Sequence, residues 1–162
     1  MDGIGDIIKR GRQLFTAREP LVSFWQELAW NFYPERADFF SDTTFGEEFG
    51  THLFDDAPVT MRRDLANSFA AMLRPRNQEW FRPVSPDEAL NEVKKVADWL
   101  DKSRVAMRRR MYAAGTQFVK STKMADHDFT TFGNAVLTVE ESPDRSGLLY
   151  RAHHLRDCAW AE

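Results

Sequence analysis

The stretch MADHDF combines two carboxylates with an imidazole, which are residue types that bind divalent metal ions in nucleases. It places Asp126, His127 and Asp128 in a row. Consecutive residues of a helix point in three different directions, so these three side chains cannot converge on one metal ion. A metal-dependent nuclease that uses Asp126, Asp128 and the histidines is therefore a hypothesis without a converging ligand set.

A second stretch, AHHLRDC, contains two histidines and the only cysteine of the chain. Adjacent residues of a strand face opposite sides of a sheet, so only one of His153 and His154 could join Cys158. A zinc site needs three or four converging protein ligands, and this stretch does not supply them. We expect one surface histidine and one packed histidine here, with no metal and no cofactor.

Sequence signatures of catalysis are absent from the chain. It contains no GxxxxGK[ST], GxGxxG, HExxH or GxSxG pattern, and no family signature surrounds Cys158. The residues therefore predict a protein that is not an enzyme and has no catalytic side chains.

Basic side chains form the remaining candidate site. One predicted helix carries the four candidate phosphate contacts, which are Arg104, Arg108, Arg109 and Arg110. Acidic residues in the same helix, including Asp98 and Asp101, favour a solvated face of mixed charge instead. No module for reading bases is visible. A small helical DNA-binding or regulatory protein that uses the Arg104 to Arg110 face is the alternative function.

Composition bounds the class of protein. The 162 residues are 43% hydrophobic and 13% aromatic, which is enough to build the core of one domain. The net charge of −3 gives no general attraction to nucleic acid or to an anionic membrane. A single cysteine excludes an internal disulfide, and no stretch reaches the ~20 apolar residues of a membrane span. We expect a folded, soluble, intracellular protein without membrane contact.

Apolar periodicity and capping residues predict helices over most of the chain. A weak amphipathic helix opens the sequence, and a strong helix runs from Pro20 to Pro34. Its predicted buried face is Leu21, Phe24, Trp25, Leu28 and Phe32. A helix capped by Asp56 follows and ends at Pro75. Its predicted stripe is Met61, Leu65, Phe69 and Met72.

Two further helices are expected in the second half of the chain. A serine cap at Ser85 opens one long helix to about Ala113, in which Arg104 is the one polar interruption of the apolar stripe. The last helix runs from about Thr116 to Gly133, because glycine supplies the left-handed residue that ends helices.

The segment between the first two strong helices, residues 35–52, has no clear period and reads as a long loop. Its phenylalanines must pack either on their own domain or on a neighbouring chain, because exposure of so much apolar area is unfavourable. The candidate subunit-interface residues are Phe39, Phe40, Phe45 and Phe49.

The C-terminal segment changes to strand spacing. NAVLTVEE alternates, SPDRSG has the composition of a turn, and LLYRAHHL is the returning strand. An isolated hairpin is marginal in water, so we expect more strands from further sequence or a partner, or a close seat on the helices. The predicted fold class is α+β, a mostly helical region followed by a β-hairpin that begins a larger sheet. We divide the chain into residues 1–50 (helices and Phe-rich loop), 51–133 (helical region) and 134–162 (hairpin).

The order of four segments resembles the N-terminal part of the portal, or head-to-tail connector, proteins of short-tailed bacteriophages. The segments contain LAWNFYPERADFF, LANSFAAMLRPRNQEWFRP, MADHDFTTFGNAVLTVEE and YRAHHLRDCAWAE, and the resemblance covers about residues 20 to 160. Arg82 and Pro83 depart from the small and apolar residues usual in the family. The matching motif positions are Leu73, Pro75, Trp80, Phe81, Gly133 and Asn134.

This resemblance implies a structural subunit of a ring, commonly of twelve copies, at one capsid vertex. Double-stranded DNA would pass through its channel, and the major capsid protein, the terminase large subunit and tail adaptor proteins would bind to it. The implied location is the virion, after assembly in the host cytoplasm. Portal proteins of this family run to several hundred residues, so the resemblance implies that this chain is the helical wing region and the first strands of the adjoining sheet.

Overall fold

The computed structural model describes residues 3–42, 44, 46–76, 78–143, 145 and 147–161. The described chain is mostly helical and ends in an antiparallel hairpin, which confirms the predicted α+β class. Two 3₁₀ turns lie at Pro34–Arg36 and Leu155–Asp157. The helices and strands are α1 (Ile4–Ala17), α2 (Glu19–Phe32), α3 (Ala57–Leu73), α4 (Glu88–Glu92), α5 (Lys94–Met111), α6 (Phe118–Phe132), β1 (Val136–Glu141) and β2 (Leu148–His153).

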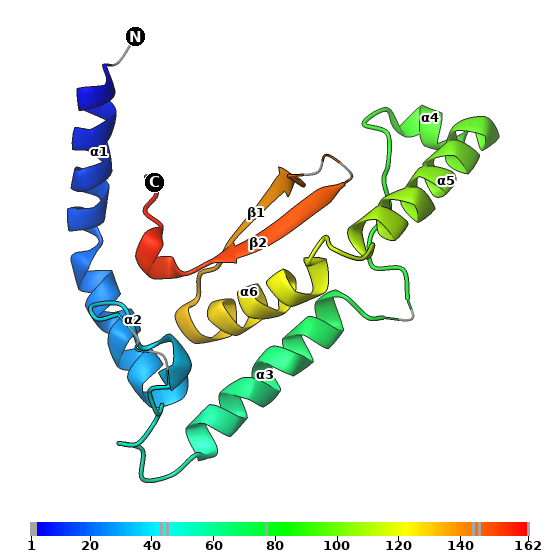
Figure 1. Ribbon diagram of the computed structural model, residues 1–162. Coiled ribbons are helices and arrows are strands. Elements are labelled where there is room, and N and C mark those ends of the chain that lie inside the picture. Colours follow the sequence, from blue (N-terminus) through cyan, green and yellow to red (C-terminus); the bar gives the residue numbers. More distant parts are fainter. Residues whose placement is uncertain are drawn as a thin grey trace.

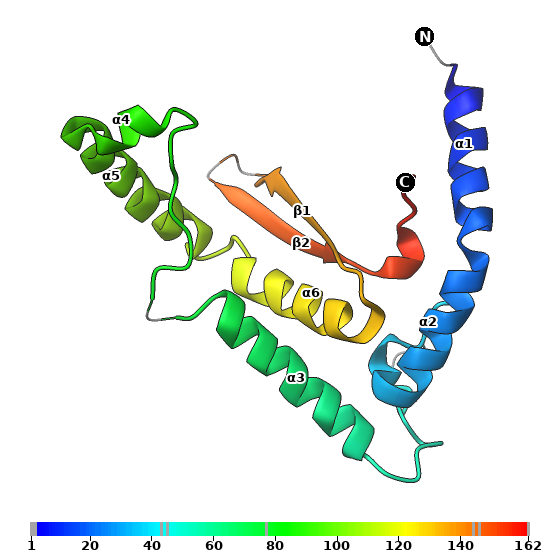
Figure 2. The same ribbon diagram turned by 180° about the vertical axis from the view of Figure 1, so that it is seen from behind.

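Helix α6 is the centre of the arrangement. Figure 1 and the reverse view in Figure 2 show α6 between the hairpin on one side and α3 on the other. Helices α1 and α2 form a long arm at one end of α6, and α4 with α5 projects at the opposite end. The molecule is therefore open, with two projecting arms and a small body.

The core of the body is small and aromatic. Trp25 of α2 is 1% exposed, and its indole Nε1 donates to the Phe132 carbonyl at 3.2 Å. The Phe39 ring packs against both, with ring centroids 5.9 Å from Trp25 and 5.5 Å from Phe132. Leu155 fills the same core from the C-terminal 3₁₀ turn. The core therefore joins α2, the loop after it, the end of α6 and the C-terminal segment.

The buried face of α2 differs from the predicted one. Val22, Trp25 and Ala29 are buried, whereas the predicted Leu21 and Phe24 are exposed, as is Phe32. Helix α2 is apolar on more than one side, so periodicity alone does not select the face that turns inward. The face that carries Ala29 is the buried one, because this small side chain lets neighbouring segments approach closely.

The predicted stripe of α3 is also largely wrong. Met61, Leu65 and Met72 are exposed, and the buried residues are Arg62 and Ala66. Helix α3 packs on α6 through these two residues and through stacking of Phe69 on Phe129, whose ring centroids lie 5.3 Å apart. A buried arginine is compatible with this packing because α6 supplies its hydrogen-bond partner.

The predicted long helix from Ser85 is two helices. Val93 is extended, with ψ of 114°, and separates α4 from α5. Its carbonyl accepts the N–H of Ala97 at 3.0 Å, which is the first hydrogen bond of α5. The Asn91 amide bonds back to the Ser85 backbone and closes α4 as a single turn. The side-chain cap of α4 is Asp87, which accepts the N–H of Ala89, rather than the predicted Ser85.

The helix-to-hairpin junction agrees with the prediction. Gly133 ends α6 with φ of +71°, and β1 pairs with β2 from Val136 opposite His153 to Glu141 opposite Leu148. The hairpin lies on α6, because the Ser121 hydroxyl donates to the Tyr150 carbonyl at 2.7 Å. The hairpin therefore packs on a helix, which is one of the predicted arrangements. Its completion into a larger sheet stays a prediction.

Candidate functional site

The three consecutive residues of the MADHDF stretch lie on three sides of α6 and meet three different arginines. Their directions diverge, as helix geometry predicts. The described part of the chain contains no group of three histidine, cysteine or carboxylate side chains that could hold a metal ion. The observed pairs are Asp126 with Arg74, His127 with Arg62, and Asp128 with Arg36.

The Asp128–Arg36 pair is the most deeply buried of the three. Arg36 donates from Nη2 to Asp128 Oδ2 at 2.7 Å and from Nε to Oδ1 at 3.2 Å, which is a bidentate contact. The Asp128 side chain is only 2% exposed. Burial raises the pKa of Asp128, and Arg36 opposes that rise. This pair fixes the turn after α2 to the C-terminal half of α6.

The Arg62 guanidinium connects three elements. It lies 3.8 Å from the centroid of the Tyr33 ring, donates from Nε to the Phe32 carbonyl at 3.2 Å, and contacts His127 Nδ1 at 2.6 Å. An arginine can only donate, so His127 Nδ1 accepts and carries no proton. Burial, with Arg62 as the next cause, lowers the pKa of His127.

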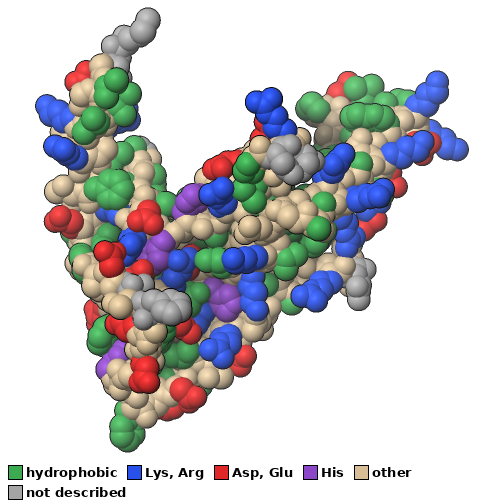
Figure 3. Space-filling view, in the orientation of Figure 1, with side chains coloured by type: hydrophobic (Ala, Val, Ile, Leu, Met, Phe, Trp, Pro, Cys, Tyr) green, Lys and Arg blue, Asp and Glu red, His purple; other side chains and the backbone are tan. Residues whose placement is uncertain are grey.

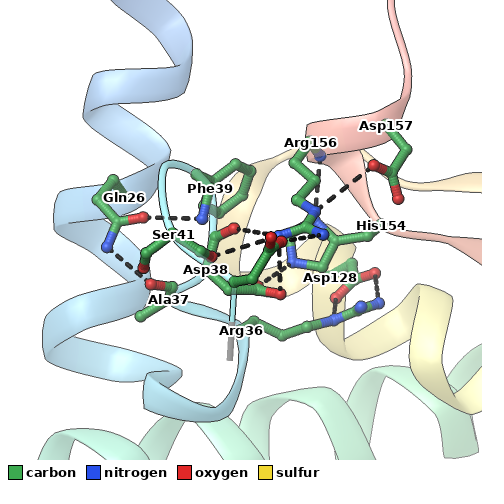
Figure 4. Close-up of polar contacts among 11 residues, drawn as sticks. Gln26, Arg36, Ala37, Asp38, Phe39, Ser41, Asp128, His154, Arg156 and Asp157 are labelled. Carbon is green, nitrogen blue, oxygen red and sulfur yellow. Dashed lines mark hydrogen bonds and ion pairs between the residues drawn. The ribbon is translucent and has the colours of Figure 1, made fainter. Parts of the chain in front are cut away.

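A second polar cluster joins the loop after α2 to the C-terminal 3₁₀ turn (Figure 4). His154 Nε2 lies 2.7 Å from Asp38 Oδ1, and His154 Nδ1 accepts the backbone N–H of Arg156 at 3.0 Å. Arg156 also donates to the Asp38 carbonyl at 2.8 Å and pairs with Asp42 at 3.0 Å. Burial is the main cause that lowers the pKa of His154, with Asp38 opposing it. Of the two adjacent histidines, His154 is thus the packed one.

Arg18, at the junction of α1 and α2, is tied to the same C-terminal turn. Its guanidinium donates to the backbone carbonyls of Leu155, Arg156 and Cys158. None of these clusters presents a nucleophile or an open ligand position. Their common effect is to hold α6, the loop and the C-terminal turn against α2.

The four candidate phosphate contacts do not form one open basic face. Arg104 is buried and pairs with Glu79 and with Asp101, whose Oδ1 lies 3.1 Å from Nη2. Arg108 donates to the Arg76 carbonyl at 2.7 Å. Only Arg109 and Arg110 remain exposed without such a contact among the described residues. The polar interruption that the sequence shows at Arg104 is therefore an internal ion pair.

The loop phenylalanines separate into two classes, and Phe45 lies outside the described residues. Phe39 is 8% exposed and belongs to the core of its own subunit, so it cannot serve as a subunit-interface residue. Its neighbour Phe40 is 65% exposed, and Phe49 is also exposed. Phe54, which was not among the predicted interface residues, is fully exposed just beyond them.

The family-motif positions lie mainly beside the hairpin and the start of α6. The Trp80 ring is nearly parallel to Phe118, with centroids 6.3 Å apart, and Phe81 packs against Trp80. Gly133 is the left-handed end of α6, and Asn134 donates to the Phe132 carbonyl at 3.4 Å. Leu73 is exposed and Pro75 is half-buried at the end of α3. These positions therefore shape turns and packing.

Large apolar side chains cover much of the surface outside the core. Monomeric proteins seldom expose large continuous apolar patches, and such patches mark contacts with other molecules. In the space-filling view, green side chains are spread along both arms (Figure 3). On α1 and α3, the exposed large side chains are Ile4, Ile7, Ile8, Phe15, Met61, Leu65, Met72 and Leu73.

Comparison with known proteins adds two findings. A family model described as "Bacteriophage head to tail connecting protein" matches residues 5–162. A curated relative, the "Probable portal protein" of Bordetella phage BPP-1, is 27% identical over 149 residues, which are 91% of this chain and 26% of the relative. The chain thus spans about a quarter of that relative's length. No solved structure matches, and no helix of the described chain is long and apolar enough to cross a membrane.

Proposed function

The chain belongs to the family of bacteriophage head-to-tail connecting proteins, and from this premise we propose that it is a structural subunit of the portal ring at the capsid vertex. The similarity to a probable portal protein over 91% of the chain supports this role. Residues 51–133 would form the helical wing region, and residues 134–162 would begin the sheet beside it.

The observation that carries the proposal is the apolar surface left exposed by a subunit whose core is small. A cyclic ring is built from one interface repeated head to tail, in which two different patches of each subunit meet. This subunit offers apolar patches at separate places, including α1, the outer face of α3 and the loop after α2. Such separated patches suit a ring subunit.

The partners follow from the proposed role. The ring, commonly of twelve copies, would sit in the virion after assembly in the host cytoplasm. It would contact the major capsid protein, the terminase large subunit and tail adaptor proteins, and double-stranded DNA would pass through its channel during packaging and ejection. The role needs no cofactor and no catalytic residue in this chain.

The charge of the chain is compatible with a channel. A formal net charge of −3 provides no strong attraction for DNA, and a channel that lets DNA slide should not bind it tightly. The alternative function, DNA binding through the arginines of α5, has only Arg109 and Arg110 fully available. A salt-dependent mobility shift of DNA by the chain would favour that alternative, and its absence would favour the ring.

Replacing Phe45 and Phe49 with serine tests the ring directly. We expect light scattering to show weaker assembly, while circular dichroism shows a folded subunit, because Phe49 is exposed within the subunit. A matched Trp99→Ser variant removes an equally large exposed side chain on α5 and should assemble normally if α5 lies outside the contact. Unchanged ring formation by the double variant would count against the role of this loop.

A further inference from the structure

Helix α1 has an unusual environment for a helix of its length. It contains 14 residues, and none of them is buried. Ile4, Ile8 and Phe15 share one face by helical spacing and are all exposed. Figure 1 and Figure 2 both show the N-terminal turns of α1 leading away from the body, and the C-terminal end of the chain is drawn beside its later turns only. The apolar face of α1 therefore has no cover within its own subunit.

Such a helix is poorly stable alone. Isolated helices of about 12 to 15 residues are marginal in water even when they are rich in alanine, and α1 contains Gly5 and Gly11, each of which weakens a helix. The side-chain hydrogen bonds that tie this end of the arm to the rest of the described chain come from Arg18, just after α1, which donates to the C-terminal carbonyls. A partner that covers the apolar face would supply the missing stabilisation.

The loop after α2 offers a second uncovered surface, of a different kind. We define the acidic loop as the described part of residues 40–56. It exposes three aromatic rings, Phe40, Phe49 and Phe54. Residues 37–57 contain six carboxylates and no lysine or arginine. The exposed carboxylates that make no ion pair with a described cation are Glu47, Glu48, Asp55 and Asp56.

The acidic loop is held in place on its inner side. Phe39 is fixed in the core just before it, and the His52 ring stacks on Trp30 with centroids 4.0 Å apart. Gly50 adopts φ of +75° and lies against Pro34, where an added Cβ would be 3.4 Å from the proline ring. The outward aromatic and acidic groups are thus presented by a fixed loop.

The polar part of α1 carries the opposite charge to the acidic loop. Lys9, Arg10 and Arg12 are exposed, and none of them pairs with an acidic side chain in the described chain. Figure 3 shows blue side chains along this arm and red ones gathered around the loop. Both surfaces therefore combine uncovered apolar groups with charge, and the charges are complementary.

One subunit cannot bring these surfaces together. In both ribbon views the loop lies beside and beyond α2, whereas the N-terminal turns of α1 lie at the other end of the arm. At a rise of about 1.5 Å per residue, the stretch of about 18 residues from Ile8 to Gln26, whose side chain binds the Phe39 N–H at the start of the loop, spans about 27 Å. A contact between the apolar face of α1 and the acidic loop therefore requires two copies of the chain.

We propose that α1 of one subunit docks on the acidic loop of the next copy of this chain, with Ile4, Ile8 and Phe15 against Phe40, Phe49 and Phe54. Arg12 borders this apolar face, and the long side chains of Lys9 and Arg10 flank it on either side, so the basic groups surround the contact with Glu47, Glu48 and Asp56. Because two different patches meet, each subunit gives one and receives one, which is the head-to-tail contact that closes a ring. This proposal rests on the proposed portal function and specifies its subunit contact.

Cross-linking between two differently labelled copies tests the contact. Both copies carry Cys158→Ser, which removes the native thiol; one carries Ile8→Cys, and the other carries Phe49→Cys and a size tag. A short bismaleimide should give a mixed product that neither copy gives alone. Trp99→Cys on α5 replaces Phe49→Cys as the matched control, because Trp99 is similarly exposed, and it should give little mixed product.

Charge reversal tests the electrostatic part with the same readout. The α1 variant Lys9→Glu, Arg10→Glu, Arg12→Glu should lower the mixed product by about tenfold, because like charges then face each other. The loop variant Glu47→Lys, Glu48→Lys, Asp56→Lys should restore it when combined with the α1 variant. The control variant Lys94→Glu, Lys95→Glu, Lys102→Glu changes the net charge equally on α5 and should have no effect.

The outcomes separate this contact from the portal ring. A mixed product that is sensitive to α1 charge supports the contact, and particle images that show only open chains would then count against the ring alone. Rings without the mixed product, or a mixed product indifferent to α1 charge, overturn the contact and leave the ring standing. Absence of both the mixed product and any assembly overturns both.

Discussion

Helices α6 and α1 are similar in length, at 15 and 14 residues, and both are amphipathic by sequence, yet their environments are opposite. Helix α6 buries Phe118 and Phe132 and meets an arginine on each of three sides. Helix α1 buries none of its residues. The same apolar periodicity thus fills the interior of the fold in one case and leaves an uncovered apolar face in the other.

This contrast separates the part of the chain that stabilises the fold from the faces that the fold leaves uncovered. Around α6, removing a side chain leaves a cavity or an unpaired charge, so the free energy of unfolding should fall steeply. On α1 and the acidic loop, the same kind of change leaves the isolated subunit intact. Stability measurements on matched variants should therefore separate the two regions.

The largest expected effect separates two adjacent phenylalanines. Phe39→Ala should lower the free energy of unfolding by about 4 kcal/mol, because the ring is buried against Trp25 and Phe132. Phe40→Ala should change it by less than about 0.5 kcal/mol, because that ring is exposed. Urea denaturation followed by tryptophan fluorescence measures both. Similar free energies of unfolding for the two variants would contradict the burial of Phe39 and the exposure of Phe40.

Breaking the deepest ion pair should have the next largest effect. Asp128→Ala leaves the Arg36 guanidinium without its carboxylate in a mostly buried place, at a cost of about 3 kcal/mol. The control is Glu140→Ala, which removes a half-exposed partner of Arg151 and should cost about 0.5 kcal/mol or less. Equal denaturation midpoints for these two variants would show that the Asp128 pair does not stabilise the body.

Two glycine substitutions should have opposite signs. Gly133→Ala forces an L-residue to φ of +71° with no side-chain clash, so it should destabilise the fold by about 1 to 2 kcal/mol. Gly11→Ala lies in exposed α1 with open space around its Cβ and should stabilise that helix by about 0.5 to 1 kcal/mol. Thermal unfolding measures the first, and helical circular dichroism the second. A loss of helicity in Gly11→Ala would contradict the structure of α1.

The smallest effect should come from pH. The pKa of His127 is lowered in the folded state, so its contribution to stability is fully present above the ordinary histidine pKa of about 6.5. That contribution is lost as the pH falls through the lower folded-state pKa, because protonation removes the acceptor of Arg62. His127→Gln should therefore flatten the fall in unfolding free energy between about pH 7 and pH 5. An unchanged slope would assign the dependence to other groups.

Local signals were sufficient where one residue decides the conformation. The end of α6 at Gly133, the strand alternation after it and the proline-bounded ends of α2 were all predicted, because these depend on backbone preferences of single residues and short periods. The break at Val93 was missed, since no proline or glycine marks it and the Asn91 amide that closes α4 acts through a side-chain bond.

Long-range pairing could not be predicted. Arg36 and Asp128 are 92 residues apart, and Arg62 and His127 are 65 apart, so no spacing rule connects them. The available signal was the presence of charged residues on an amphipathic helix, at Asp126 and Asp128, and of Arg104 within an apolar stripe. Such residues need partners when buried, but the sequence does not say which ones.

Most of the helices, the final hairpin, the lack of catalytic signatures and the resemblance to phage connector proteins could be read from the amino-acid sequence, because each is encoded in local spacing or motif order. Which apolar faces turn inward depends instead on the tertiary packing. Helices α2 and α3 each have more apolar surface than the small core accepts, and the choice depends on close approach at Ala29 and Ala66. The faces left outside, on α1, on α3 and on the acidic loop, are available to a partner because the tertiary packing of this subunit does not cover them.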